Sequence, residues 1–139
     1  MDLAQYYGIQ LGDKVSRLKR GVPFVRHYAV YLGMDAYGRH IFAENNAQNG
    51  VQYVSADDFF RDSVSVKIES TGRNLAQRQK AVTFGVQRIG QKYDLLNYNC
   101  EHFANEVTTG LSVSNQVGIG VSIAVLVIGG VIAHNQKNS

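Results

Sequence analysis

The stretch Asn97–Phe103, NYNCEHF, contains the only cysteine of the chain and decides how the remaining sequence is interpreted. Asn99 is a favourable helix N-cap, so we expect a helix that begins near Asn99 and stops at Gly110. Cys100 then lies in the first turn, where unpaired backbone N–H groups and the helix macrodipole favour an anion. This position is typical of a thiolate nucleophile, although a small buried cysteine without chemistry is the alternative.

A cysteine nucleophile requires a base, and the sequence contains four histidines. His102 is two residues from Cys100, which corresponds to roughly 200° of rotation around a helix, so it should face away from the thiol. His134 follows an apolar C-terminal segment. His27 and His40 each lie near the start of a predicted strand, which is a rigid place to hold an imidazole.

Periodicity and residue type predict five strands, at residues 13–18, 26–32, 40–44, 51–54 and 64–68. Short turns join consecutive strands, so the predicted sheet is antiparallel and the fold class is α+β. Strand alternation puts His27 on one face together with Ala29 and Tyr31. If this face covers the helix of Cys100, the histidine and the cysteine can pair.

Helix signals occur at three places in the sequence. Ser55 begins a pattern that resembles a capping box, so a short helix is expected through residues 59 and 60. Asn74 is a candidate N-cap for a long helix. The apolar stripe of this long helix is predicted to comprise Leu75, Val82, Val86 and Ile89. The buried face of the helix near Asn99 is predicted to comprise Phe103, Val107 and Leu111.

Composition limits the class of protein. A chain of 139 residues is long enough for one domain with one core. One cysteine excludes an intramolecular disulfide and a cysteine-rich zinc site, and it fits a reducing compartment such as the cytosol. The remaining potential ligands are scattered, so we predict no metal and no other cofactor. The N-terminus carries no secretory signal pattern.

The net charge of +3 is modest, but basic residues gather just before His27. These residues are Arg17, Lys19, Arg20 and Arg26. Such a cluster can bind an anionic phospholipid surface or nucleic acid, or it can simply be a solvated loop.

The C-terminal part has a different composition. Residues 117–133 read VGIGVSIAVLVIGGVIA, are apolar except for Ser122 and carry no charge. These 17 residues are at the short limit for a membrane-spanning helix. A buried core element is the alternative, but a domain of about 115 residues has little interior for a helix that is apolar on all sides.

The motifs together resemble a known family. RHYAVYLG at residues 26–33, followed by NCEHFANEV at residues 99–107, is similar to the lecithin:retinol acyltransferase family, closest to its small phospholipase A/acyltransferases, the H-Ras-like suppressors. GDKV at residues 12–15 resembles the first strand of that domain, and residues 113–133 resemble its membrane tail. The resemblance implies a circularly permuted papain-like (NlpC-type) fold with an antiparallel sheet packed against helices. It divides the chain into a catalytic domain, residues 1–112, and a membrane-anchoring segment with a short polar tail, residues 113–139.

The resemblance also assigns roles to residues. Cys100 matches the nucleophile that carries the acyl thioester, and His27 matches the general base. A third polar residue, often histidine, orients the base from the next strand. His40 fits this residue type and is our prediction, while the alternatives are Glu44, Asn45 and Asn46.

The activity that the resemblance implies is that of a phospholipase A1/A2 and acyltransferase. Such an enzyme cleaves an acyl ester of a glycerophospholipid and passes the acyl group to water, an amine or a lysolipid. The basic residues before His27 would then lie near lipid headgroups, with no nucleic acid as partner, and the protein would be cytoplasmic and attached to a membrane by its C-terminal segment.

The sequence is also compatible with two other functions. A papain-like cysteine peptidase or amidase uses the same cysteine and histidine, but it has no need of the apolar segment. A non-catalytic, membrane-tethered adaptor would retain the fold with an unreactive thiol.

Overall fold

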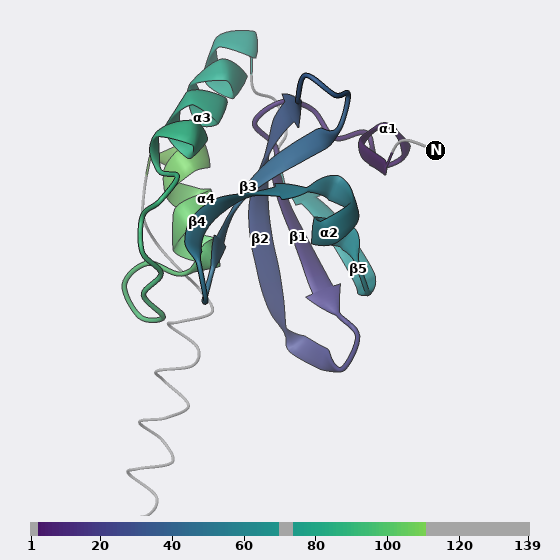
Figure 1. The fold of residues 1–139 in the computed structure, drawn as a ribbon, viewed down its shortest axis with the longest axis vertical. Coiled ribbons are helices and arrows are strands. Elements are labelled where there is room, and N and C mark those ends of the chain that lie inside the picture. Colours follow the sequence, from purple (N-terminus) through teal and green to yellow (C-terminus); the bar gives the residue numbers. More distant parts are fainter. Residues whose placement is uncertain (1–2, 70–73, 111–139) are drawn as a thin grey trace, which may run out of the picture.

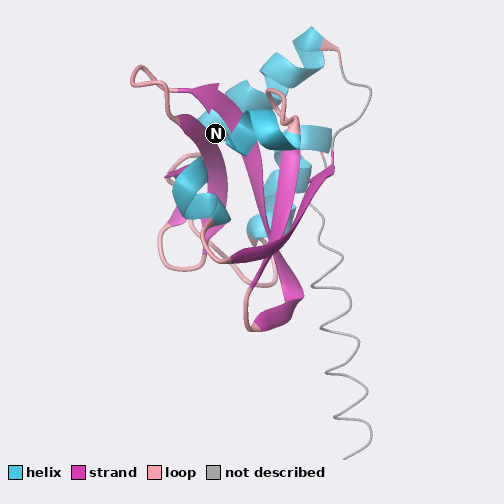
Figure 2. Cartoon of the chain, turned by 90° about the vertical axis from the view of Figure 1, so that its right-hand side faces the viewer, coloured by secondary structure: helices cyan, strands magenta, loops and turns pink. Residues whose placement is uncertain are grey.

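The computed structural model describes residues 3–69 and 74–110, which form an antiparallel sheet with helices on both of its faces (Figures 1 and 2). The strands are β1 (Lys14–Lys19), β2 (Val22–Met34), β3 (His40–Asn46), β4 (Gly50–Ser55) and β5 (Ser63–Glu69). The helices are α1 (Leu3–Tyr7), α2 (Ala56–Phe60), α3 (Leu75–Gln87) and α4 (Cys100–Thr109). The strand order is β4-β3-β2-β1-β5 with antiparallel pairs throughout, which confirms the predicted α+β class and antiparallel sheet.

The predicted helix starts are confirmed by their caps. Ser55 caps α2 and Asn74 caps α3, each through a side-chain oxygen that accepts a backbone N–H of the first turn. Asn99 caps α4 in the same way, and the helix stops at Gly110, whose φ of 82° lies in the left-handed region that favours glycine. Local sequence signals therefore determine that Cys100 is the first residue of α4.

The predicted apolar stripe of α3 is wrong for Leu75 and Val86, which are 64% and 44% exposed, whereas Ile89 packs against the core as predicted. The helix instead buries Ala81 and Gly85. A Cβ atom added to Gly85 would lie 3.2 Å from Cδ2 of Leu32, so α3 lies too close to the sheet for a larger side chain. Small residues form this contact, and a search for large apolar residues at helical spacing does not detect them.

The close contact of α3 predicts the effect of a substitution. Gly85→Val should destabilise the protein by about 1–3 kcal/mol, because the added methyl groups must displace Leu32, Ala43 and Val107 from a packed core. Gly85→Ala is the matched control, since the closest atom to its single methyl group is the flexible end of Leu32, while Val107 and Ala43 lie at ordinary contact distances of 3.7 and 3.8 Å. Alanine also has the higher helix propensity. Chemical denaturation of both variants measures the difference, and equal stability of the two would contradict the close packing.

The predicted domain boundary after residue 112 and the predicted membrane helix within residues 113–139 lie outside the described residues. Within residues 3–69 and 74–110, no helix has the length and apolar character needed to cross a membrane.

Candidate active site

Cys100 lies at the N-terminus of α4 and is 8% exposed. The side chain of Asn99 accepts hydrogen bonds from the N–H groups of Glu101 and His102, at 2.9 and 3.1 Å. In return, Nδ1 of His102 accepts the N–H of Asn99 at 3.1 Å. His102 therefore serves the helix cap, as expected of a histidine that does not face the thiol.

The predicted packing of the Cys100 helix on the sheet face that contains His27 is wrong. Helix α4 packs on the sheet face of Tyr28 and Val30. His27 lies on the opposite face, where its ring centroid is 5.9 Å from that of Phe59 in α2. Successive residues of a strand point to opposite faces, so a helix that packs on Tyr28 does not cover His27.

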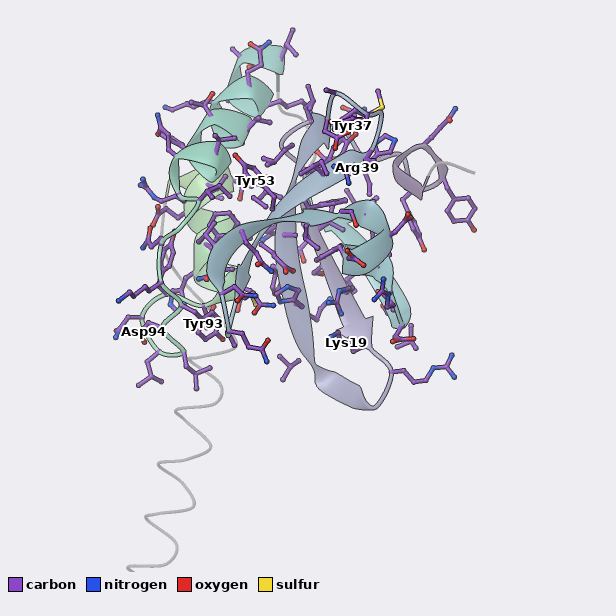
Figure 3. The ribbon with its side chains drawn as sticks, in the orientation of Figure 1. Lys19, Tyr37, Arg39, Tyr53, Tyr93 and Asp94 are labelled. Atoms are coloured by element: carbon purple, nitrogen blue, oxygen red, sulfur yellow. The ribbon has the colours of Figure 1, made fainter. Side chains whose placement is uncertain are left out.

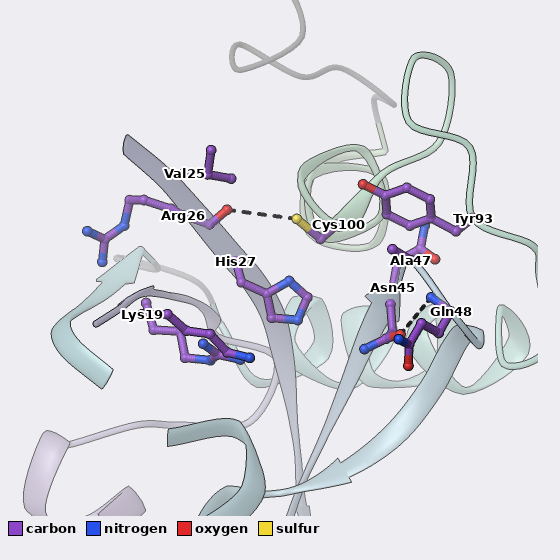
Figure 4. A pocket seen from close by; sticks show the side chains of 11 residues that line it. Lys19, Val25, Arg26, His27, Asn45, Ala47, Gln48, Tyr93 and Cys100 are labelled. Atoms are coloured by element: carbon purple, nitrogen blue, oxygen red, sulfur yellow. Dashed lines mark hydrogen bonds between the residues drawn. The ribbon is translucent and has the colours of Figure 1, made fainter. Parts of the chain in front are cut away.

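Cys100 and His27 nevertheless meet, because β2 and β3 separate near His27. The pairing of the two strands extends as far as Ala29 opposite Glu44, and the end of β3 pairs with β4. The start of α4 lies at this opening, with the sulfur of Cys100 3.9 Å from the carbonyl oxygen of Arg26. Figure 4 shows the His27 ring directed toward the sulfur, so two residues from opposite sides of the sheet share one site.

A carboxylate holds His27 on its other side. Nε2 of His27 donates a hydrogen bond of 2.6 Å to Oε2 of Glu44, whose side chain is only 6% exposed. The second oxygen of Glu44 accepts a hydrogen bond of 2.9 Å from the amide of Gln52. Because Glu44 occupies Nε2, Nδ1 is the ring nitrogen left for Cys100. The order thiol, imidazole, carboxylate is the arrangement of an activated nucleophile.

The electrostatics of the site favour charged forms. Burial alone would lower the pKa of His27, but hydrogen bonds to Cys100 and Glu44 and the negative charge of both raise it to about 9. Burial alone would raise the pKa of Glu44, but the hydrogen bond and positive charge of His27 lower it overall. The raised pKa of His27 favours an imidazolium beside Cys100 at neutral pH.

His40, the predicted third residue, lies elsewhere. It pairs with Met34 at the far end of the β2–β3 hairpin, and its Nδ1 shares a hydrogen bond of 2.5 Å with the hydroxyl group of Tyr31. Met34 is seven positions from His27 along β2, which corresponds to about 20 Å in a strand. The predicted contact between His40 and His27 is therefore wrong, and among the alternatives Glu44 makes it.

The opening between the strands is a pocket of about 430 Å³ that contains the thiol and His27. The turn of residues 45–48 and the side chain of Tyr93 also line it (Figures 3 and 4). Tyr93 was not predicted, because it lies on an irregular loop before α4 whose path no periodicity reveals. Asn45 fixes this loop by donating a hydrogen bond of 2.7 Å to the carbonyl group of Tyr98. In the described part of the chain, no three histidine, cysteine or acidic residues lie close enough together to hold a metal ion.

The four basic residues before His27 do not form one exposed surface. Arg17 is only 5% exposed, and Arg26 donates hydrogen bonds to hydroxyl and carbonyl groups of β1 and β5. Lys19 and Arg20 are exposed. Arg17, Lys19 and Arg26 line the thiol pocket, whereas Arg20 is outside its lining.

A comparison with protein-family profiles identifies the family of the chain. The profile described as lecithin retinol acyltransferase matches residues 4–113, a range that includes every residue lining the thiol pocket. The chain belongs to the lecithin retinol acyltransferase family. A comparison with curated proteins gave no match. Family membership indicates an enzyme of the acyltransferase and thiol hydrolase type with a lipid substrate.

The lecithin retinol acyltransferase match confirms the resemblance that was based on the two motifs. Both motifs contribute to the pocket: the first, RHYAVYLG, supplies His27 on β2, and the second, NCEHFANEV, supplies Cys100 on α4. Glu44 and Gln52 complete the charged side of the site from β3 and β4. Gln52 is directly opposite Glu44 in the strand register, so counting residues outward from the Asn46–Gly50 turn would have revealed this contact.

Proposed function

We propose that the protein is a thiol acyltransferase and phospholipase that cleaves an acyl ester of a glycerophospholipid through a thioester on Cys100. The observation that carries this proposal is the hydrogen-bonded series of Glu44, His27 and Cys100 at the wall of an open pocket. In this arrangement the chain order is base before nucleophile, which fits a circularly permuted papain-like enzyme.

The first half of the reaction forms the thioester. His27 holds the proton of Cys100, and the thiolate attacks the ester carbonyl to form a carbon–sulfur bond. Asn99 caps the N–H groups of Glu101 and His102, so the N–H of Cys100 is the first-turn donor that the cap leaves for the oxyanion. The carbon–oxygen ester bond then breaks, and His27 gives its proton to the oxygen of the departing lysophospholipid.

The second half transfers the acyl group. His27, now neutral, takes a proton from water, an amine or the hydroxyl group of a lysolipid, and the acceptor attacks the thioester carbonyl carbon. The carbon–sulfur bond then breaks, which releases the acylated acceptor and returns the Cys100 thiolate beside the protonated His27. Water completes a phospholipase reaction, whereas an amine or a lysolipid completes an acyl transfer. Glu44 stabilises the imidazolium in both halves and keeps Nδ1 directed at the reacting groups.

The test of this function is intact-mass spectrometry after brief incubation with phosphatidylcholine vesicles and a fast acid quench. We expect a mass increase of one fatty-acyl group that hydroxylamine removes. A matched incubation with a peptide amide substrate distinguishes the peptidase and amidase alternative. No lipid adduct, combined with rapid alkylation of Cys100 and turnover of the amide, would replace the lipid function with that alternative.

We also propose that residues 117–133 attach the enzyme to the cytoplasmic face of a membrane. Deletion of residues 117–139 should leave the protein in the supernatant after sedimentation with vesicles and lower its activity on vesicles by at least about tenfold, because tethering raises the effective substrate concentration. Activity on a soluble short-chain ester should stay unchanged and serves as the control. Unchanged sedimentation of the deletion variant would refute the anchor.

A further inference from the structure

Arg17 is a buried charge, and two of its side-chain nitrogens have no hydrogen-bonding partner in the described part of the chain. The residue is only 5% exposed. Its Nε and Nη1 atoms are buried and form no hydrogen bond to the described part of the chain. The guanidinium lies 5.1 Å over the ring of Phe59, which supplies a cation–π contact but no acceptor. Enclosing these donors without an acceptor costs free energy, so their presence in the pocket wall points to a ligand that supplies the acceptor.

Arg17 lies close to His27 and Glu44 on the same face of the sheet. In the register of β1 and β2, Arg17 is directly opposite His27, so the two side chains share one sheet face. The nearby carboxylate of Glu44 already accepts hydrogen bonds from His27 and Gln52 through its two oxygens. Glu44 therefore attracts Arg17 at a distance but does not satisfy its donors.

Arg17 also lies where two pockets meet. Arg17, Lys19 and Asn46 line both the thiol pocket and a second, polar pocket of about 660 Å³. The second pocket extends along the sheet toward Arg39, which Figure 3 places at the other end of the sheet from Lys19. A molecule with an ester in one pocket and a polar group in the other would cross the boundary at these three residues.

Other charges around the second pocket are already paired. Arg39 forms an ion pair with Asp35, and Arg61 forms one with Asp58. Among the described residues that line this pocket, Arg17 and Lys19 are the cations that form no ion pair. A guanidinium beside an ammonium is a suitable site for a phosphodiester anion.

We propose that Arg17, assisted by Lys19, binds the phosphodiester of the substrate at this boundary and so makes the enzyme select phospholipids over neutral acylglycerols. The scissile ester then lies in the pocket of Cys100, and the headgroup lies in the polar pocket. This inference rests on the proposed function and adds the residue that recognises the substrate class.

The first test compares Arg17→Met with the full-length wild type on dioleoylphosphatidylcholine and dioleoylglycerol in the same detergent micelles. Loss of a buried charged contact should lower kcat/KM for the phospholipid by roughly 30-fold or more, with less than about a threefold change for the neutral lipid. Lys67→Met is the matched control, because Lys67 is an exposed cation. It is opposite Ser16 in the register of β1 and β5, so its side chain lies on the other face of the sheet from Arg17. This variant should leave both rates unchanged.

Two results of this comparison would overturn the inference. An equal loss on both lipids would assign Arg17 to the positioning of His27 rather than to phosphate recognition. An unchanged phospholipid rate would remove Arg17 from the site altogether. Thermal unfolding provides the check on folding: Arg17→Met should unfold at the same or a higher temperature, because the variant no longer buries unpaired donors.

A binding measurement separates this inference from the proposed function. Calorimetric titration of Cys100→Ser with dihexanoylphosphatidylcholine reports binding without chemistry. Adding Arg17→Met to that variant should weaken binding at least about tenfold. If wild type forms no acyl adduct but this difference appears, the lipid chemistry is wrong and the phosphate site stands. If binding is equal in both proteins, the phosphate site is wrong whatever the chemistry.

Discussion

Replacing Cys100 with serine is expected to lower phospholipid turnover by roughly 10³- to 10⁶-fold, the range seen when the nucleophile of a catalytic triad is removed. The reason is chemical, because sulfur is a much stronger nucleophile than the oxygen of a serine hydroxyl, which keeps its proton at neutral pH. The measurement is fatty acid release from phosphatidylcholine vesicles. The acyl adduct seen by mass spectrometry should disappear together with the turnover.

The control for this prediction is lipid binding, which should survive in Cys100→Ser because the substitution changes one atom at the wall of the pocket. Alkylation of the wild type by iodoacetamide at neutral pH gives an independent measure of thiolate character. Turnover of Cys100→Ser within tenfold of the wild type would contradict the thioester mechanism. A thiol that resists alkylation, in a protein that forms no adduct, would favour the non-catalytic adaptor.

Local signals predicted the parts of the site that depend on nearby residues. The caps at Asn99 and Gly110 fix the α4 helix, and the helix fixes Cys100 at its first turn. Strand propensity located His27 on β2. The contact between them was predicted by resemblance and not by periodicity, because it depends on where β2 and β3 separate, a property of the whole sheet.

The prediction of His40 instead of Glu44 as the residue that orients His27 failed for a related reason. The two residues lie on the same face of β3, so alternation does not distinguish them. Their difference is the hairpin register, in which His40 is opposite Met34 and Glu44 is opposite Ala29. Similarly, a cluster of basic residues in the sequence gives no sign that Arg17 is buried while Arg20 is exposed.

The second large effect is expected for Glu44→Gln, which should lower kcat/KM by roughly 10²- to 10⁴-fold. Glu44 accepts a hydrogen bond from Nε2–H of His27, which leaves Nδ1 to exchange the proton of Cys100. A glutamine amide can donate to Nε2 instead, and the ring then carries its proton on Nδ1, where it cannot accept one from the thiol. His40→Gln is the matched comparison, and its turnover should stay within about threefold of the wild type.

The pH dependence of Glu44→Gln distinguishes a catalytic carboxylate from one that only supports the fold. The charge and hydrogen bond of Glu44 help to raise the pKa of His27 from its ordinary value of 6.5 to about 9, so their loss lowers this pKa. The rate needs the imidazolium to protonate the leaving group, so the alkaline limb of the pH profile, near pH 9 in the wild type, should move to lower pH. The same raised pKa stabilises the folded protein below about pH 6.5, and this contribution is lost as the pH rises through about 9. Glu44→Gln should therefore lose stability mainly toward the acidic side of the range from about pH 6.5 to about 9. If neither the alkaline limb of the rate profile nor the pH dependence of stability shifts, Glu44 does not act through His27.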